Sequence, residues 1–256
     1  KKEDTMMIQY IIVCPLVFLA GLVDSIAGGG GLISLPAYMI AGVPPHQALG
    51  TNKMGSAMGT VVSTLRLAKH GYLKGKMHIA LGAAAAALAG SALGSHLALL
   101  VPDTVIRNLM VVILPVTAFY VLRQKKDQEG EREPLPPAQL TAVSLGAAFF
   151  LGGYDGFYGP GTGTFLILVL TGAARLDIRT ASALTKVINL SSNVAALATF
   201  LLTGNVNCTL GLAAGVCCIA GHYLGAGMVV HDGKKIVRPV VLVVLALLFV
   251  KVISGM

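Results

Sequence analysis

The chain has 256 residues, of which 55% are hydrophobic and only 12% are charged, and its formal net charge is +8. Soluble domains carry about 25% charged residues, so this composition excludes an ordinary soluble fold and predicts an integral membrane protein. The Lys and Arg residues are scattered through short loops, as membrane topology signals are, and they give no indication of nucleic-acid binding.

The first half of the chain opens with two apolar segments that a glycine cluster separates. Residues 8–27 contain Asp24 and end at Gly28–Gly31, and residues 32–41 are too short to cross a bilayer, which takes about 20 residues. Residues 42–45 form a turn, because the two prolines in it have no amide donor. Three spanning helices are then expected, at residues 47–67, 79–100 and 105–122.

A hydrophilic segment at residues 123–137 divides the chain, and the second half repeats the order of the first. Residues 140–157 and 164–171 form a second interrupted pair, separated by the glycines around Pro160. A basic turn is expected at residues 231–238, and three spans are expected at residues 180–202, 210–230 and 239–253.

The two halves match in register. Asp155 lies 131 positions after Asp24, and Lys186 lies 133 positions after Lys53, so the turn between them differs by two residues. An acid, a glycine cluster and a lysine that recur in this order indicate an internal duplication.

Loop charges predict that the duplication is inverted. The loop at residues 66–76 is strongly basic, whereas its counterpart at residues 203–207 has no charge. Positive loops stay in the cytoplasm, so corresponding loops lie on opposite sides of the membrane. Residues 124–137 are then a cytoplasmic linker between repeats 1–123 and 138–256, and both termini lie outside.

The expected fold is therefore all-α. It is a polytopic membrane protein with two inverted-topology repeats, each with a broken or re-entrant helix pair followed by three spanning helices. Discontinuous helices in such repeats are typical of secondary transporters, which hold the substrate near the bilayer midplane.

The two glycine clusters, Gly28–Gly31 and Gly159–Gly163, are suited to anion binding. Glycine lets backbone amides approach a ligand, and the helix that begins after each cluster presents free N–H groups to an anion. Both clusters could instead serve only close packing or a hairpin turn, and that alternative stays open.

Four charged residues lie inside the apolar segments, where an unpaired charge is costly and usually marks an ion or proton path. They are Asp24, Asp155, Lys53 and Lys186. One explanation is that each Asp pairs with a Lys, so that the lysines attract an anion and the aspartates carry protons for coupling. The alternatives are purely structural salt bridges, or lysines whose ammonium groups reach the membrane surface.

Polar residues beside each lysine extend the candidate site. Lys186, Asn189 and Asn193 share one helix face, and Asn52 precedes Lys53. The sequence shows no metal-ligand spacing, cofactor motif or catalytic arrangement, so no metal, cofactor or enzymatic activity is expected. The candidate substrate-binding residues are Gly28, Gly29, Gly30, Gly31, Asn52, Lys53, Gly159, Gly161, Thr162, Gly163, Lys186, Asn189 and Asn193, and the candidate coupling residues are Asp24 and Asp155.

At these residues the sequence resembles the TauE/SafE family, also described as sulfite-exporter-like or sulfonate-permease-like membrane proteins. The matching pieces include AGLVDSIAGGGG in the first half and GGYDGFYGPGTG in the second, and the resemblance covers nearly the whole chain. It implies a carrier for small anions, often sulfite, thiosulfate or organosulfonates, in the bacterial cytoplasmic membrane. It does not identify the anion or the direction of transport.

The expected function is secondary transport of sulfite or another sulfur oxyanion or organosulfonate, by alternating access and with protons as candidate coupling ions. The expected partners are the anion, protons and the lipid bilayer, with a homo-oligomer as a further option. Two alternatives stay open: a passive anion channel, and a membrane receptor or structural protein that does not transport.

Overall fold

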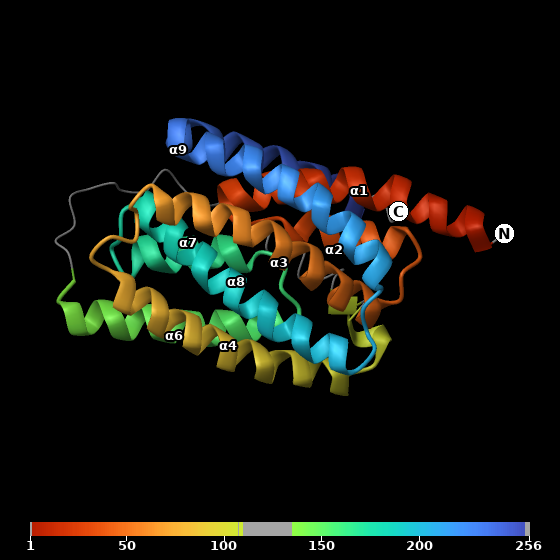
Figure 1. The fold of residues 1–256 in the computed structure, drawn as a ribbon, viewed down its shortest axis with the longest axis horizontal. Helices are drawn as coiled ribbons and strands as arrows, with labels where there is room; N and C mark the ends of the chain where they lie inside the picture. Colours follow the sequence, from red (N-terminus) through yellow and green to blue (C-terminus); the bar gives the residue numbers. More distant parts are fainter. Residues whose placement is uncertain (1, 107, 110–134, 254–256) are drawn as a thin grey trace.

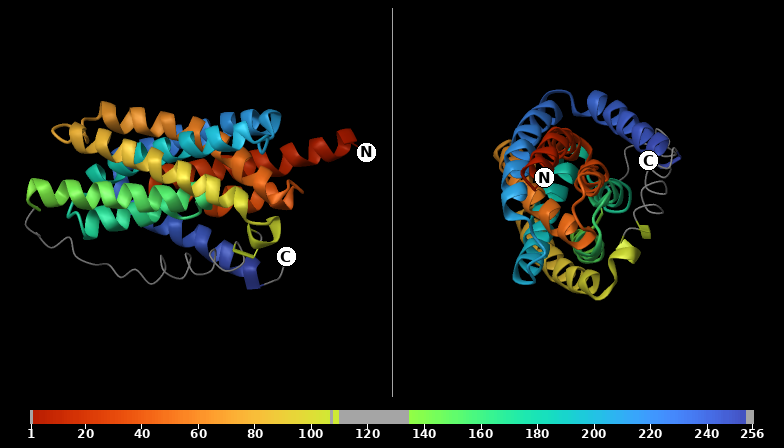
Figure 2. Two further views of the ribbon diagram at one scale, coloured as in Figure 1. Left: turned by 90° about the horizontal axis from the view of Figure 1, so that it is seen from below. Right: turned by 90° about the vertical axis from the view of Figure 1, so that its right-hand side faces the viewer.

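The computed structural model describes residues 2–106, 108–109 and 135–253, with side-chain surroundings only between residues 6 and 230. Every regular element in these ranges is an α-helix, as the sequence predicts, and most helices run roughly along the long axis of the molecule (Figures 1 and 2). The helices are α1 (Lys2–Ala27), α2 (Gly31–Ile40), α3 (Pro45–Lys69), α4 (Met77–Leu100), α6 (Pro137–Phe157), α7 (Thr162–Gly172), α8 (Ile178–Leu202) and α9 (Cys208–Ile253).

Local sequence signals set where several helices begin. Pro45 begins α3 and Pro137 begins α6, at the first helical position, where the N–H that proline lacks has no helical partner. Asp177 caps α8, because its carboxylate accepts hydrogen bonds from the backbone N–H groups of Arg179 and Thr180, at 3.1 and 3.0 Å. The boundaries expected from the sequence are therefore close to those observed.

The described helices fall into long and short classes. The short ones are α2 and α7, with 10 and 11 residues, and neither can cross a bilayer alone, as expected. The expected span at residues 105–122 and the linker at residues 124–137 lie largely outside the described residues. Four described segments are long and apolar enough to cross a membrane: Met6–Ala27, Met77–Leu100, Ile178–Leu202 and Cys208–Val230.

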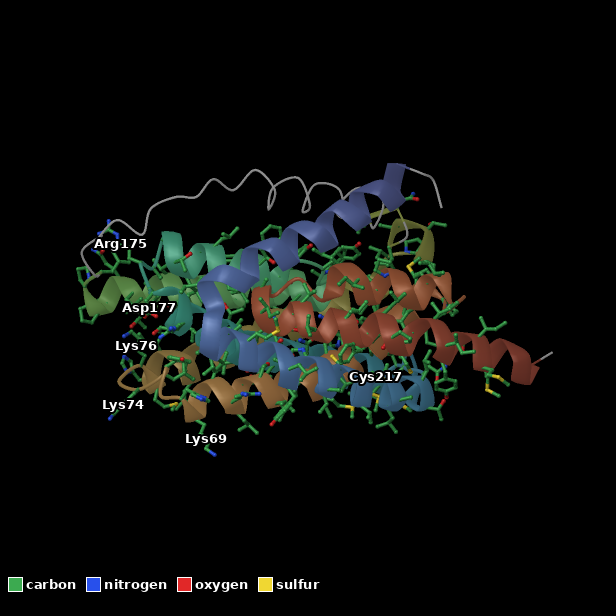
Figure 3. The ribbon with its side chains drawn as sticks, turned by 90° about the horizontal axis from the view of Figure 1, so that it is seen from above. Lys69, Lys74, Lys76, Arg175, Asp177 and Cys217 are labelled. Atoms are coloured by element: carbon green, nitrogen blue, oxygen red, sulfur yellow. The ribbon has the colours of Figure 1, made fainter. Side chains whose placement is uncertain are left out.

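The last part of the chain differs from expectation. The basic turn expected at residues 231–238 is wrong, because α9 continues as one helical element through it to Ile253. Charged residues do not end a helix, and residues such as Gly233 and Pro239 bend a long helix rather than necessarily stopping it. Figure 3 shows that α9 changes direction sharply part-way along its length.

The two halves of the chain are completed by helices from each other. The helix α1 packs along α9, and α6 packs along α4, while α3 and α8 pack against each other at the centre. Two hydrophobic cores result, and both draw residues from both halves. One contains Tyr38 of α2 with Phe200 of α8, and the other contains Ile26 of α1 with Leu166 of α7.

Small residues allow these exchanged contacts. A Cβ on Gly90 or Gly94 of α4 would overlap the backbone of α6, and one on Gly221 of α9 would overlap the backbone of α1. Membrane helices use such small residues to bring their backbones close together.

Candidate functional site

The two breaks between helices meet inside the protein. One break lies between α1 and α2 and the other between α6 and α7, and each contains a left-handed glycine, Gly28 with φ +75° and Gly159 with φ +100°. A Cβ on Gly28 would overlap the backbone of Gly163 in the other break. The hydroxyl of Thr164 donates a hydrogen bond to the carbonyl of Ala27, at 2.9 Å, and so ties the two breaks together.

The first ion pair joins Lys53 of α3 to Asp155 of α6. The Nζ atom of Lys53 lies 2.9 Å from Oδ2 of Asp155, and the lysine is only 2% exposed. The hydroxyl of Ser192 donates a second hydrogen bond to the same carboxylate oxygen, at 2.6 Å. This carboxylate is therefore held by one charged and one neutral donor.

The second ion pair joins Lys186 of α8 to Asp24 of α1. The Nζ atom of Lys186 lies 3.0 Å from Oδ2 of Asp24 and also donates to the backbone carbonyl of Asp24. The N–H of Gly30 donates to the other carboxylate oxygen, at 3.2 Å. The Nε2 atom of His222 lies 3.5 Å from Oδ2.

Both ion pairs cross between the halves of the chain. Each lysine pairs with the aspartate of the other half, which confirms that each Asp has a Lys partner. The alternative in which the lysines reach the membrane surface is wrong, because Lys53 and Lys186 are 2% and 1% exposed and their ammonium groups are paired.

A small polar cavity lies where the two breaks and the ion pairs meet. Its volume is about 30 Å³, against the roughly 10–15 Å³ that a single water needs. Gly31 and Thr162, the first residues of α2 and α7, both line it, so the N-terminal ends of both short helices face the cavity. Its lining residues are Asp24, Gly28, Gly31, Asn52, Lys53, Ser56, Asp155, Gly159, Thr162, Gly163, Asn189 and Asn193.

Most of the residues predicted for the site therefore come together, but four predicted binding residues do not line this cavity. The N–H of Gly30 is used by Asp24, and the ammonium of Lys186 is also bound to Asp24, which itself lines the cavity. Gly29 and Gly161 belong to the breaks without lining the cavity. They shape the backbone there, and the positive φ of Gly161, +87°, requires a glycine.

Two features of the site go beyond the sequence-based prediction. His222 is buried beside Asp24, and a lone histidine in an apolar helix gave no spacing signal that could have identified it. The Oδ1 atom of Asn189 is buried at the cavity without a hydrogen-bond partner among the described residues. An amide side chain offers a donor or an acceptor according to which way it is turned, so Asn189 is equipped to bind a polar ligand.

Metal binding has no support in the geometry. Among the residues that the structure describes, no group of three or more His, Cys, Asp or Glu side chains is placed to hold a metal ion. The chemistry available at the cavity is that of ammonium groups, carboxylates, amides and backbone N–H groups.

An all-helical chain with membrane-spanning segments and a buried, charged, polar site belongs to the class of polytopic membrane proteins. More specifically, it belongs to the TauE/SafE family, since the family described as "Sulfite exporter TauE/SafE" matches residues 13–252.

Three similar proteins support this assignment. The chain is 36% identical over 240 residues to "Probable membrane transporter protein ORF9" of a Sinorhizobium species, covering 93% of this chain and 89% of that one. It is 33% identical over 241 residues to a "Probable membrane transporter protein" of Haemophilus influenzae, covering 92% and 91%. It is 31% identical over 242 residues to "Probable membrane transporter protein YfcA" of Escherichia coli K12, covering 93% and 87%. No solved structure matches the chain.

The family and these relatives are membrane transporters and not enzymes. The chain is therefore a membrane transporter that works within a lipid bilayer on a small substrate. The comparisons confirm the resemblance seen in the sequence.

Proposed function

We propose that the protein is a secondary transporter of a small anion, sulfite or another sulfur oxyanion or organosulfonate, which it moves by alternating access. The observation that carries this proposal is the cavity at the two helix breaks. It combines the ammonium of Lys53, the amides of Asn52, Asn189 and Asn193, and the N-terminal ends of two short helices. The family name, which refers to sulfite, agrees with this chemistry.

The arrangement of the short helices favours an anion over a cation. The first turn of a helix leaves backbone N–H groups without helical partners, and the helix dipole places partial positive charge there. Both α2 and α7 begin at the cavity, so two such ends act on the same small space. The N–H groups of Leu32, Ile33 and Thr162 already donate to backbone carbonyls, so an oxyanion would draw mainly on the partial positive charge of the two helix ends together with the lysine.

The charge balance of the site supports proton coupling. Lys53, Lys186, Asp24 and Asp155 form two pairs whose charges cancel. An anion that entered alone would bring an uncompensated negative charge into the membrane interior, which is costly. If an aspartate of the site takes up a proton when the anion enters, the site stays neutral. Asp24 and Asp155 are therefore the proposed coupling residues.

The packing supports two inverted repeats, residues 1–123 and 138–256, and the proposed location is the cytoplasmic membrane. The contact of α1 with α9 has its counterpart in the contact of α6 with α4, as a pseudo-twofold relation requires. In Figure 1 the chain enters α1 from one end of the molecule and α6 from the opposite end. The short α2 and α7 then make each interrupted pair a broken or re-entrant unit.

Surface charge supports the proposed orientation. Lys69, Lys74 and Lys76 lie at the same end of the molecule as Arg175 (Figure 3). Basic loops face the cytoplasm, so this end is the proposed inside. The start of α1 and the end of α9 lie at the opposite end (Figure 2), which supports the proposal that both termini lie outside.

The test is thermal stabilisation of the purified full chain by a panel of anions. Sulfite, thiosulfate, sulfoacetate and taurine are compared with sulfate, carboxylates and chloride, because a ligand that binds only the folded protein raises its melting temperature. We expect one sulfur anion to stabilise the wild type selectively and the Lys53→Met variant not at all. The matched control is Lys69→Met, which changes an exposed lysine of the same helix and should keep the full response.

Three outcomes contradict the proposal. A response that Lys53→Met retains would place the anion away from this cavity. No response to any anion, together with no uptake into proteoliposomes, would remove the support for anion transport. Conductance that does not saturate with substrate, without counterflow, would instead indicate a passive channel.

A further inference from the structure

The two buried carboxylates differ in one of their partners. Each accepts a hydrogen bond from a lysine, but Asp155 also accepts one from the hydroxyl of Ser192, whereas the imidazole of His222 lies beside Asp24. A serine hydroxyl stays neutral, while a ring nitrogen of an imidazole can accept a proton and become charged. The Asp24 end of the site therefore has a second group able to hold a proton.

This difference arises at two paired positions of the repeat. Gly59 lies 133 positions before Ser192, and Ser91 lies 131 positions before His222, with the same offsets that relate the lysines and the aspartates. A Cβ on Gly59 would lie 2.5 Å from Cδ2 of His222, so the ring fits only because position 59 has no side chain. The positions that Gly59 and His222 occupy beside Asp24 are thus taken by Ser192 and Ser91 at the matching site of Asp155.

The hydrogen bonds around His222 determine where a proton can be held. The hydroxyl oxygen of Ser63 lies 3.1 Å from the carbonyl of Thr60 and 3.0 Å from Nδ1 of His222. We take its proton to be donated to that carbonyl, in which case it accepts a hydrogen bond from Nδ1. Nδ1 then carries the ring proton, and a neutral ring presents the lone pair of Nε2 to the carboxylate of Asp24. Two facing lone pairs repel each other, so a proton between Nε2 and Oδ2 relieves that repulsion.

The surroundings direct this proton to the cavity. Asp24 lines the cavity, whereas His222 is 1% exposed and is not part of its lining. From α3 the ring lies against the neutral Gly59 and Ser63. Arg66 of that helix donates to the carbonyl of Tyr223. The other charged or titratable groups facing the pair are Lys186 from α8 and Cys218 from α9 itself.

We propose that Asp24 and His222 together form the proton-exchange site of the transport cycle, so that of the two coupling residues proposed above Asp24 takes up the proton and Asp155 keeps its charge throughout. This inference rests on the proposed function. A proton that moves from the cavity onto the Asp24–His222 pair weakens the attraction that holds Lys186 to Asp24. Lys186 is then free to turn toward an anion, so that the anion and the proton load together.

The test measures how many protons are taken up when an anion binds. Binding of thiosulfate to the purified full chain is followed by titration calorimetry in two buffers with different ionisation enthalpies. Thiosulfate is the probe because it does not itself titrate near neutral pH. We expect the wild type to take up protons and His222→Gln to lose at least half of that uptake, while Ser192→Ala, which changes the matching partner of Asp155, keeps it. Unchanged uptake in His222→Gln, or loss in Ser192→Ala, would overturn the proposal.

Two further measurements keep this proposal separate from the proposed function. If His222→Gln does not fold, the double variant Gly59→Ser/His222→Ser replaces it, because it copies the serines that occupy the matching positions at the Asp155 site, Ser192 and Ser91. If no anion of the panel binds, the proposed function fails, and the proton site is tested without an anion. The difference in melting temperature between wild type and His222→Gln should then vary with pH, and a difference that stays constant with pH would contradict the proposal.

Discussion

The ion pair between Lys53 and Asp155 allows a quantitative prediction. Lys53→Met removes an ammonium group that lies 2.9 Å from the carboxylate of Asp155 and is almost fully buried. Breaking a buried ion pair costs about 3–5 kcal/mol, because the remaining charge has no partner. Ser192 still donates a hydrogen bond to the carboxylate, so we expect the lower end of that range.

The double variant Lys53→Met/Asp155→Asn should recover most of this loss. Neither charge remains, and the replacement of a buried pair by uncharged groups is often neutral. The double variant should therefore lose less free energy of unfolding than the two single variants lose together, and the difference should exceed about 2 kcal/mol. The control Lys53→Met/Asp24→Asn should be close to additive, because Asp24 pairs with Lys186 instead.

Thermal unfolding of the purified variants, followed by circular dichroism in detergent, provides the assay. For a chain of this size about 1 kcal/mol corresponds to 2–4 °C, so Lys53→Met should melt roughly 6–12 °C below the wild type and the double variant much closer to it. Additive losses at Lys53 and Asp155, or strong coupling between Lys53 and Asp24, would refute the crossed pairing of the two halves.

Two further predictions concern the backbone and a helix cap. Gly28→Ala should lower the free energy of unfolding by more than the about 1–2 kcal/mol that left-handed strain costs, because its Cβ overlaps the backbone of Gly163. The control Gly42→Ala, with φ +78° and open space around it, should show the strain alone. Equal losses in melting temperature would contradict the close contact between Gly28 and Gly163. Asp177→Ala should cost about 0.5–2 kcal/mol through the lost cap of α8, and Asp177→Asn much less. Burial raises the pKa of Asp177, but hydrogen bonds from Thr180 and the neighbouring N–H outweigh it and hold the pKa below its ordinary value. The ionised cap therefore stabilises the fold above about pH 4, and this stabilisation is lost as the pH falls. The difference in melting temperature between wild type and Asp177→Ala should become smaller in acid. A difference that does not change with pH would contradict this account.

Much of the site could be predicted because it is encoded locally. A charged residue inside an apolar segment and a glycine cluster before a short helix are both readable from a few neighbouring residues. Asp24, Lys53 and their counterparts were identified in this way, and so was the shortness of α2 and α7. The choice of partner for each lysine could not be predicted, because it depends on how the two halves cross.

The misses have equally specific causes. His222 carries no motif, and only comparison of its register position with Ser91, together with the glycine at position 59, reveals that the two halves differ. The turn expected at residues 231–238 relied on charge, although charge does not break a helix and α9 runs through it. Whether Gly29 and Gly161 face the cavity depends on backbone direction within a few residues, which composition does not determine.

The exchanged packing of α1 with α9 also constrains how the protein is made. During synthesis α1 is made well before α9, its main packing partner. Until α9 arrives, α1 has to remain in lipid without that partner, and its span has a mean hydropathy of 2.3, against 1.2 to 1.6 for the other three. By contrast, α8 is the least apolar of the four spans. It is made after α3 and α4, the helices it packs against, so these partners are already present when it enters the membrane. Lys53 likewise has no counter-charge until Asp155 has been synthesised, so α3 settles stably only once the second half of the chain has entered the membrane.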